Sequence, residues 1–169
     1  MRKVLVPTVI VALVLGIIGG AVYSYFSSHD LEIYGDNSAE HQHLPAEKHG
    51  NLTVLRDPDR ALEVAGQKNL PIFLDFYADW CTNCVKFQSR MLEHTALNAA
   101  LQKVVVLQIH DTDRAYDRFA KDGRFDEINM ALPLFAVLNA KGELIWKGQD
   151  YTDDAAMISA MRKAAGQTE

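Results

Sequence analysis

The stretch DFYADWCTNCVKF (residues 75–87) contains both cysteines of the chain, Cys81 and Cys84. It overlaps an apolar run, PIFLDFY (71–77), whose aromatic and branched side chains predict a buried strand. The residues that follow the cysteines, VKFQSRMLEH (85–94), predict a helix. The two thiols are therefore expected at the junction where a strand ends and a helix begins.

A helix start is a favourable place for a reactive thiol. The first turn presents unpaired N–H groups and about half a positive charge, which together stabilise an anion. A thiolate at that position has a lowered pKa, and the thiolate is the form that attacks disulfides. Cys81 comes first and is the expected nucleophile, whereas Cys84 lies three residues later and can return to it. This spacing predicts a pair that opens and closes.

Two other interpretations of the cysteine pair stay open from the residues alone. A CxxC pattern is also half of a zinc or copper site, which needs two further ligands. The sequence has no second CxxC, and His94 and His110 stand alone. A polar segment before the domain holds four more histidines, His29, His41, His43 and His49. A purely structural disulfide is the third interpretation, although closing so short a loop removes little chain entropy.

The residues from 51 onward have the pattern of one α/β domain. Strands are predicted at NLTVL (51–55), PIFLDFY (71–77), VVVLQI (104–109), LFAVLN (134–139) and ELIWKG (143–148). Helices are predicted after Asp57-Pro58, after the cysteines, at ALNAALQ (96–102), within DRAYDRFAKDGRFDEIN (113–129) before a loop, and at TDDAAMISAMRKAA (152–165). This order predicts a mixed sheet with helices on both faces.

The segment FLDFYADWCTNCVKF (73–87) resembles the active-site segment of the thioredoxin family, a buried-strand Asp followed by Trp-Cys-x-x-Cys. Leu132-Pro133 stands before the LFAVLN strand, where that family carries a cis-proline, and the likeness covers about residues 51–166. The YADWC sequence, and Gln108 near where many thioredoxins have Lys, are most similar to the C-terminal periplasmic domain of the DsbD family. The resemblance implies a thioredoxin-like α/β fold.

The resemblance also implies roles for the matching residues. Cys81 and Cys84 are the redox pair, and Asp75 is the buried carboxylate that shuttles a proton for Cys84. The substrate-binding residues are Trp80, Leu132 and Pro133. No metal ion and no cofactor beyond the cysteine pair is implied. From the residues alone, Asp75 is also compatible with a structural pairing and Pro133 with an edge strand.

The dipeptide between the cysteines departs from the family's best-known versions. Thr82-Asn83 is neither Gly-Pro, as in thioredoxins, nor Pro-His, as in strong oxidants of this fold. With no cation there, the reduced form is less stabilised and the couple is more reducing, which favours a reductase. Leu132 is bulkier than the usual residue before the proline, which leaves the choice of partner open.

The N-terminal residues 1–26 are predicted as a membrane anchor. The apolar run Val4–Val22 is 19 residues long, close to the ~20 that cross a bilayer as a helix. Arg2 and Lys3 precede this run and acidic residues follow it, which predicts that the remainder of the chain is exported. A cleaved signal peptide is the alternative, because Gly19-Gly20-Ala21 offers small residues for a peptidase.

Behind the anchor, residues 27–50 are predicted as a polar linker and 51–169 as the thioredoxin-like domain. The chain of 169 residues has a net charge of −5 and no Lys/Arg-rich run, which argues against nucleic acid as a partner.

These features predict a thiol–disulfide oxidoreductase that reduces protein disulfides, tethered to a bacterial inner membrane and facing the periplasm. Soluble periplasmic protein, after signal cleavage, is the alternative location. The predicted partners are periplasmic protein disulfides and a membrane electron donor of the DsbD/CcdA kind. A disulfide oxidase or isomerase, and a copper-handling protein that uses the CxxC and the histidine-containing linker, are the alternative functions.

Overall fold

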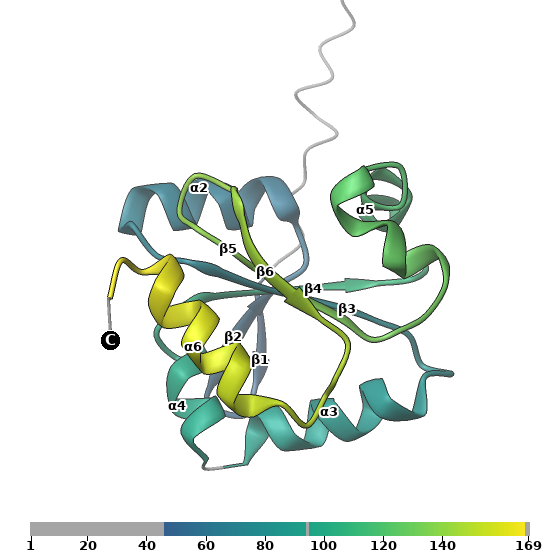
Figure 1. The fold of residues 1–169 in the computed structure, drawn as a ribbon, viewed down its shortest axis with the longest axis horizontal. Coiled ribbons are helices and arrows are strands. Elements are labelled where there is room, and N and C mark those ends of the chain that lie inside the picture. Colours follow the sequence, from purple (N-terminus) through teal and green to yellow (C-terminus); the bar gives the residue numbers. More distant parts are fainter. Residues whose placement is uncertain (1–45, 94, 168–169) are drawn as a thin grey trace, which may run out of the picture. The chain divides into compact units, whose positions relative to one another are not determined.

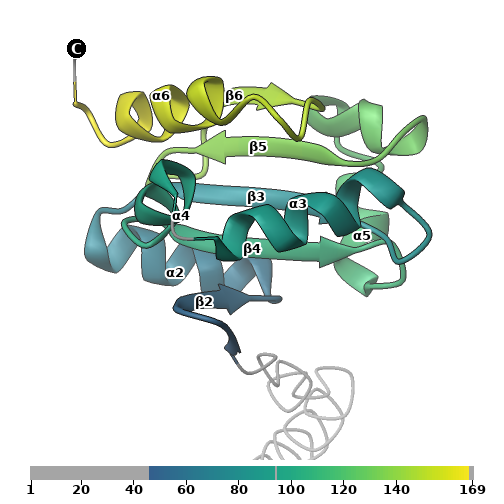
Figure 2. The same cartoon turned by 90° about the horizontal axis from the view of Figure 1, so that it is seen from below.

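The computed structural model describes residues 46–93 and 95–167. The predicted anchor and most of the predicted linker lie outside these residues. Within the described residues, six strands form one sheet in the order β1-β2-β4-β3-β5-β6. The strands are β1 (Glu47–His49), β2 (Leu52–Leu55), β3 (Ile72–Tyr77), β4 (Val105–His110), β5 (Leu134–Leu138) and β6 (Leu144–Gly148). Figure 2 shows β5, β3, β4 and β2 side by side in that order.

The centre of the sheet is parallel and its two ends are antiparallel. Strand β4 pairs in parallel with β2 on one side and with β3 on the other. Strands β5 and β6 continue the sheet in antiparallel pairing, and β1 pairs antiparallel with β2 at the opposite edge. The carboxyl ends of β2, β4 and β3 therefore meet at one edge, where crossover connections place loops and helix starts.

Helices cover both faces of the sheet (Figure 1). They are α2 (Pro58–Lys68), α3 (Thr82–Leu92), α4 (Ala96–Leu101), α5 (Arg114–Phe119), the 3₁₀ helix η2 (Gly123–Asn129) and α6 (Asp154–Ala164). The core under α2, α5 and η2 contains Ile72, Leu74 and Phe76 from β3. The core on the other face, under α3, α4 and α6, contains Phe73. The alternation along β3 thus divides its apolar side chains between two cores.

The predicted helix starts are confirmed by their caps. Asp57 accepts hydrogen bonds from the N–H groups of Asp59 and Arg60, and Pro58 occupies the first helical position of α2. The helix ends at Asn69, whose left-handed backbone (φ +51°) closes the last turn. At α6, Asp153 accepts from the N–H of Ala156 at 3.0 Å.

Two elements differ from the sequence-based expectations. Strand β1 lies within the 27–50 segment that carried no strand pattern, and its residues Glu-Lys-His gain their conformation by pairing with β2. Residues 123–129 form η2 where a loop was expected, because Phe125 and Ile128 are buried in the core. The hairpin turn runs from Asn139 to Gly142, whose φ of +80° suits glycine.

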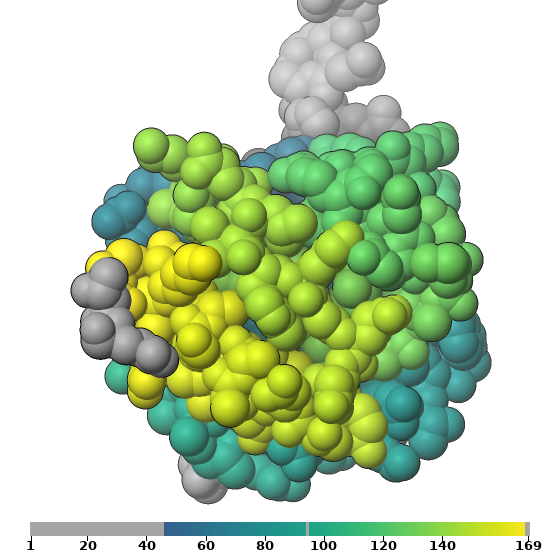
Figure 3. All heavy atoms as spheres, in the orientation of Figure 1, coloured from purple at the N-terminus to yellow at the C-terminus, as the bar shows by residue number. Residues whose placement is uncertain are grey.

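The predicted α/β class, with a mixed sheet and helices on both faces, is confirmed. Residues of β6 and α6, coloured light green to yellow in Figure 3, cover much of the face seen there. Within residues 46–93 and 95–167, no helix combines the length and the apolar character needed to cross a membrane. The predicted membrane helix falls outside those residues.

Candidate redox site

Cys81 and Cys84 form a disulfide at the start of α3. Cys81 caps the helix in an extended backbone conformation, and its Sγ accepts a hydrogen bond from the N–H of Cys84 at 3.1 Å. Thr82 and Asn83 are exposed, whereas both cysteines are buried. The first turn of α3 carries no acidic residue, so the positive end of the helix is not neutralised there. The structure therefore places Cys81 where a thiolate is stabilised.

The disulfide lies in a small apolar cluster at the carboxyl edge of β3. Ala78 is buried with the two cysteines, and Tyr77 and Leu132 pack against them. The Leu132–Pro133 peptide bond is cis, as predicted, and Pro133 is buried. Leu132 is thus in contact with the cysteine cluster although it is more than 40 residues away along the chain.

Trp80 precedes the first cysteine and is 70% exposed. Its Nε1 donates a hydrogen bond to Oδ2 of Asp111 at 2.8 Å, which orients the ring toward the loop after β4. Met130, three residues before the cis-proline, is 79% exposed.

Asp75 is buried within β3, on the face covered by α3. It is 1% exposed, and Gln108 on the neighbouring strand donates to its Oδ2 from Nε2 at 2.8 Å. Burial raises the pKa of Asp75 to about 7, against the opposing effects of the Gln108 hydrogen bond and the Arg56 charge. Its Oδ1 is buried with no hydrogen-bond partner, a position that accommodates a proton. The carboxyl is therefore poised to change ionisation near neutral pH.

Helix α3 lies over the same face as Asp75. Its buried side chains are Cys84, Phe87 and Met91. Phe87 stacks with Phe73, two residues before Asp75, and Met91 Sδ lies 3.6 Å from the Gln108 Nε2 that also holds Asp75. Because Cys84 shares the buried face of α3 with these two contacts, Asp75 and Cys84 border the same part of the interior.

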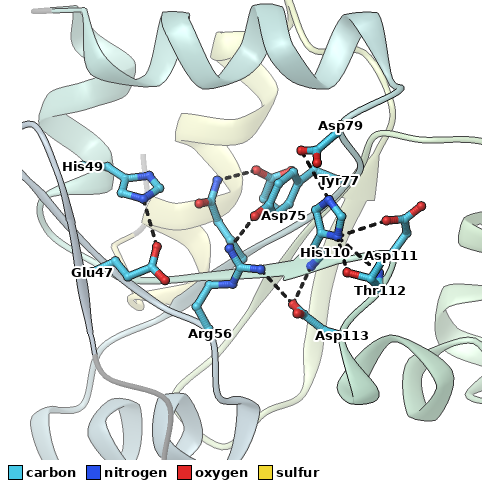
Figure 4. A network of polar contacts seen from close by, with 11 residues as sticks. Glu47, His49, Arg56, Asp75, Tyr77, Asp79, His110, Asp111, Thr112 and Asp113 are labelled. Atoms are coloured by element: carbon cyan, nitrogen blue, oxygen red, sulfur yellow. Dashed lines mark hydrogen bonds and ion pairs between the residues drawn. The ribbon is translucent and has the colours of Figure 1, made fainter.

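A network of polar side chains surrounds the carboxyl ends of the parallel strands (Figure 4). The guanidinium of Arg56 donates to the hydroxyl of Tyr77 and, at 3.0 Å, to Oδ2 of Asp113. The same Oδ2 accepts from the backbone N–H of His110 at 2.8 Å, which fixes the loop after β4. The imidazole of His110 in turn lies 3.0 Å from Asp111, the acceptor for Trp80.

Sequence reasoning missed this network. Arg56, Tyr77 and Asp113 come from three separate segments, 21 and 57 residues from Arg56 along the chain. A usable signal exists in the sequence, because Arg56 directly follows a predicted strand, Tyr77 ends another, and Asp113 lies in the short segment after a third. Such ends converge at one edge of a sheet.

The described residues contain no group of three or more histidine, cysteine or acidic side chains arranged to hold a metal ion. His49 and His110 belong to that part of the chain, and each contacts a carboxylate, Glu47 and Asp111 respectively. The other linker histidines and His94 lie outside it.

Comparison with known proteins agrees with this site. A family model described as thioredoxin-like matches residues 53–140. The chain is 30% identical over 118 residues to thiol:disulfide interchange protein DsbD 1 of Pseudomonas aeruginosa, covering 68% of this chain and 20% of that protein. It is 27% identical over 130 residues to DsbD of Pseudoalteromonas atlantica, covering 75% and 21%. The chain thus spans about a fifth of the length of these curated relatives.

Solved structures show the same fold. The reduced C-terminal domain of DsbD from Neisseria meningitidis superposes with a TM-score of 0.50 at 22% identity, covering 63% of this chain and 92% of that one. A DsbH oxidoreductase superposes with a TM-score of 0.51 at 18% identity, covering 78% and 99%. The family match, the DsbD relatives and the Cys81–Cys84 disulfide together support thiol–disulfide chemistry. By its sequence and by its fold, the chain belongs to the thioredoxin-like family.

Proposed function

We propose that this protein is a thiol–disulfide oxidoreductase that reduces disulfides of periplasmic proteins through Cys81 and Cys84. The observation that carries the proposal is the disulfide at the start of α3, on the sheet face that also buries Asp75. A structural disulfide has no need of a carboxyl held near neutral pKa, whereas a pair that exchanges protons with each turnover does.

The proposed reaction begins with the protein in its dithiol form. The Cys81 thiolate attacks one sulfur of the substrate disulfide, and the other substrate sulfur leaves as a thiolate and takes a proton. Cys84 then gives its proton to Asp75 and attacks Cys81 Sγ, which releases the second substrate sulfur as a thiolate. This thiolate takes a proton from the solvent, and Asp75 gives up to the solvent the proton that it received from Cys84. The substrate has gained two electrons and two protons, and the protein is left with the Cys81–Cys84 disulfide.

Asp75 is the proposed proton acceptor in the second step. Burial holds its pKa at about 7, so both its forms are populated at neutral pH. A carboxyl of ordinary pKa is a weaker base toward a thiol, and one of much higher pKa is already protonated. The environment of Asp75 thus suits exchange of a proton with Cys84 in either direction.

The direction of electron flow is proposed from the residues between the cysteines. Thr82 and Asn83 bring no positive charge to the exposed start of α3. The Cys81 thiolate is therefore stabilised by the helix start without help from a cation. Less stabilisation of the reduced form means a lower reduction potential, which favours donation of electrons.

The proposed setting is the periplasmic side of a bacterial inner membrane, with residues 1–26 as the anchor. Such a compartment is kept oxidising, so the oxidised pair needs a dithiol donor supplied through the membrane, of the kind found in DsbD and CcdA proteins. Trp80, Leu132 and Pro133 are the proposed contacts for the substrate segment. The exposed indole and the position of Leu132 against the cysteines support this assignment.

The reduction potential of the purified protein tests the direction. Equilibration with defined ratios of reduced and oxidised dithiothreitol or glutathione, followed by alkylation, measures the fraction of open disulfide. We expect a value near the ~−270 mV of thioredoxin. A value near ~−120 mV would instead identify a disulfide oxidase.

Trapping tests the assignment of roles. The variant Cys84→Ala cannot complete the second step and is expected to accumulate mixed disulfides through Cys81, which mass spectrometry can identify. The matched variant Cys81→Ala is expected to accumulate far fewer. Equal trapping by both variants, or by neither, would contradict the proposed order of attack.

A further inference from the structure

A guanidinium stands at the end of β2 on the same face of the sheet as Asp75. The register pairs Val54 with Val106 across β2 and β4, and Asp75 with Gln108 across β3 and β4. Since side chains alternate between faces, Arg56 continues the face of Val54, as Gln108 continues that of Val106. The side chains of Arg56, Gln108 and Asp75 therefore follow one another across three parallel strands.

Arg56 is held in place from two sides (Figure 4). One amino group donates to the hydroxyl of Tyr77, and the other donates to Asp113 at 3.0 Å. Its guanidinium carbon lies 5.2 Å from the centre of the Tyr77 ring, and its side chain is only 15% exposed. Tyr77 itself packs against the buried cluster of Ala78, Cys81 and Cys84. Arg56 is thus a positive charge held in a fixed place, and Tyr77 connects it to the cysteine cluster.

A fixed charge at this place acts on Asp75. Asp75 is fully buried and the side chain of Arg56 is partly buried, so water screens their attraction less than it would in solvent. The positive charge of Arg56 favours the ionised form of Asp75 and lowers its pKa against the larger, opposite effect of burial. Without Arg56, burial is opposed by the Gln108 hydrogen bond alone.

We propose that Arg56 is a positioning residue of the redox site, whose guanidinium, fixed by Tyr77 and Asp113, sets the ionisation of Asp75 and so the pH range in which Cys84 can release its proton. This inference rests on the proposed function of Asp75 and adds to it a residue from another strand. The titratable and charged groups around Asp75 come from several elements: Arg56 after β2, Tyr77 on β3, Cys84 on α3 in the reduced form, His110 at the end of β4, and Asp113 in the loop that follows.

The direct test is the titration of Asp75 in the oxidised protein, where neither cysteine titrates. The carboxyl carbon of Asp75 is followed by ¹³C NMR from pH 4 to 10, with Asp75→Asn used to assign the signal. In Arg56→Met the midpoint is expected to move to higher pH, and in Arg56→Lys, which keeps the charge, it is expected to return toward the wild-type value. Arg118→Met is the matched control, because Arg118 is exposed and pairs with Asp59 on the surface.

The catalytic consequence is measured as a pH profile. The rate at which the reduced protein opens an aromatic disulfide probe, and the rate at which its own disulfide then closes, are recorded separately. At pH 7 the closing step of Arg56→Met is expected to be slower than wild type by at least about threefold, and the deficit is expected to vanish at alkaline pH. In the Asp75→Asn background, Arg56→Met is expected to have no further effect on the profile.

The outcomes separate the inference from the proposed function. A wild-type protein that does not react with the probe contradicts the proposed function itself. A reactive wild type whose Asp75 midpoint is the same in Arg56→Met contradicts only the role of Arg56. If Arg56→Met does not fold, Asp113→Asn gives the answer, because it leaves the guanidinium charge uncompensated and is expected to move the Asp75 midpoint to lower pH. A midpoint that stays fixed in Asp113→Asn, or rises, contradicts the inference.

Discussion

Asp75 owes its chemistry to its position in an apolar strand. Its neighbours Leu74 and Phe76 face one core, while Asp75 faces the other, beneath α3. No cation forms a direct ion pair with it among the contacts of the described residues, and Gln108 supplies a neutral donor. A carboxyl that is desolvated and only partly compensated takes up a proton more readily than one in water.

The raised pKa of Asp75 predicts a pH dependence of stability. In the unfolded chain the group titrates near 3.8, and in the folded protein near 7. Between these values the folded state binds the proton more tightly, so its contribution to the unfolding free energy is complete below about pH 4 and is lost as pH rises to about 7. A difference of this size between the folded and the unfolded pKa of Asp75 corresponds to roughly 4 kcal/mol of unfolding free energy.

Urea unfolding of the oxidised protein at several pH values measures this dependence. In Asp75→Asn the slope between pH 4 and 7 is expected to be smaller than in wild type, and stability at pH 8 is expected to be higher, since no charge is then buried. An unchanged slope would show that Asp75 is not the group that titrates. Asp79→Asn is the control, because Asp79 is exposed.

Gln108 offers a second prediction at the scale of single residues. Its hydrogen bond to Oδ2 favours the ionised form of Asp75, so Gln108→Leu is expected to raise the pKa of Asp75 further. The ¹³C titration of the carboxyl checks the direction. Gln67→Leu, at an exposed position of α2, is the matched control. A lowered midpoint in Gln108→Leu would contradict this view of the site.

At the scale of elements, the start of α3 combines a helix end with the reactive sulfur. The positive end of the helix is open at Thr82 and Asn83, both exposed, so their side chains can be changed without disturbing the core. A charge introduced at residue 82 or 83 is therefore expected to change the stability of the Cys81 thiolate directly.

Asn83→His is expected to make the couple more oxidising. A protonated imidazole beside the Cys81 thiolate stabilises the reduced form, and about 1.4 kcal/mol corresponds to about 30 mV. The reduction potential at pH 6, measured by equilibration with glutathione, is expected to be less negative than in wild type by tens of millivolts. Asn83→Gln, which adds no charge, serves as the control. A more negative potential in Asn83→His would refute the explanation.

Elements with strong patterns were predictable and those defined by pairing were not. The runs at 71–77 and 104–109 are apolar throughout because both faces of these parallel strands are covered, and they became β3 and β4. Strand β1 has a charged sequence, and only its partner β2 makes it a strand. In α6 the buried residues are Met157, Ala160 and Met161. Which side of this helix is buried depends on how the helix packs on the sheet, and a local sequence pattern does not determine that packing.

At the scale of the whole domain, the sheet separates two hydrophobic cores. Phe76 lies in one, in contact with the rings of Phe119 and Phe125 at centroid distances of 5.1 and 5.5 Å. Phe87 lies in the other, 4.3 Å from the ring of Phe135 and 6.0 Å from that of Phe73. Both phenylalanines are fully buried.

Truncation of either ring is expected to destabilise the whole domain. Phe76→Ala and Phe87→Ala are each expected to cost about 3–5 kcal/mol, a large part of the stability of a domain of this size. Urea unfolding followed by far-UV circular dichroism and by tryptophan fluorescence measures the loss. Coincident transitions by both probes are expected. Leu62→Ala, at a partly exposed position, is the control and is expected to cost much less.

The site was predictable where chemistry is local in sequence. Cys81, Cys84 and Asp75 lie within ten residues of one another, and the residue types alone indicate their chemistry. Arg56 and Asp113 reach the site only because two other parallel strands end beside β3. Their contribution depends on strand order, β2-β4-β3, which no local pattern determines.

The two outermost strands of the sheet give it protection against self-association. Strand β1 has three residues, and two of them, Glu47 and Lys48, are charged. Strand β6 has five residues and includes Lys147, which forms an ion pair with Glu127. Short, charged margins are poor templates for the strand of another molecule. The edges of the sheet in the described domain are therefore unfavourable for strand pairing with a second copy of this domain.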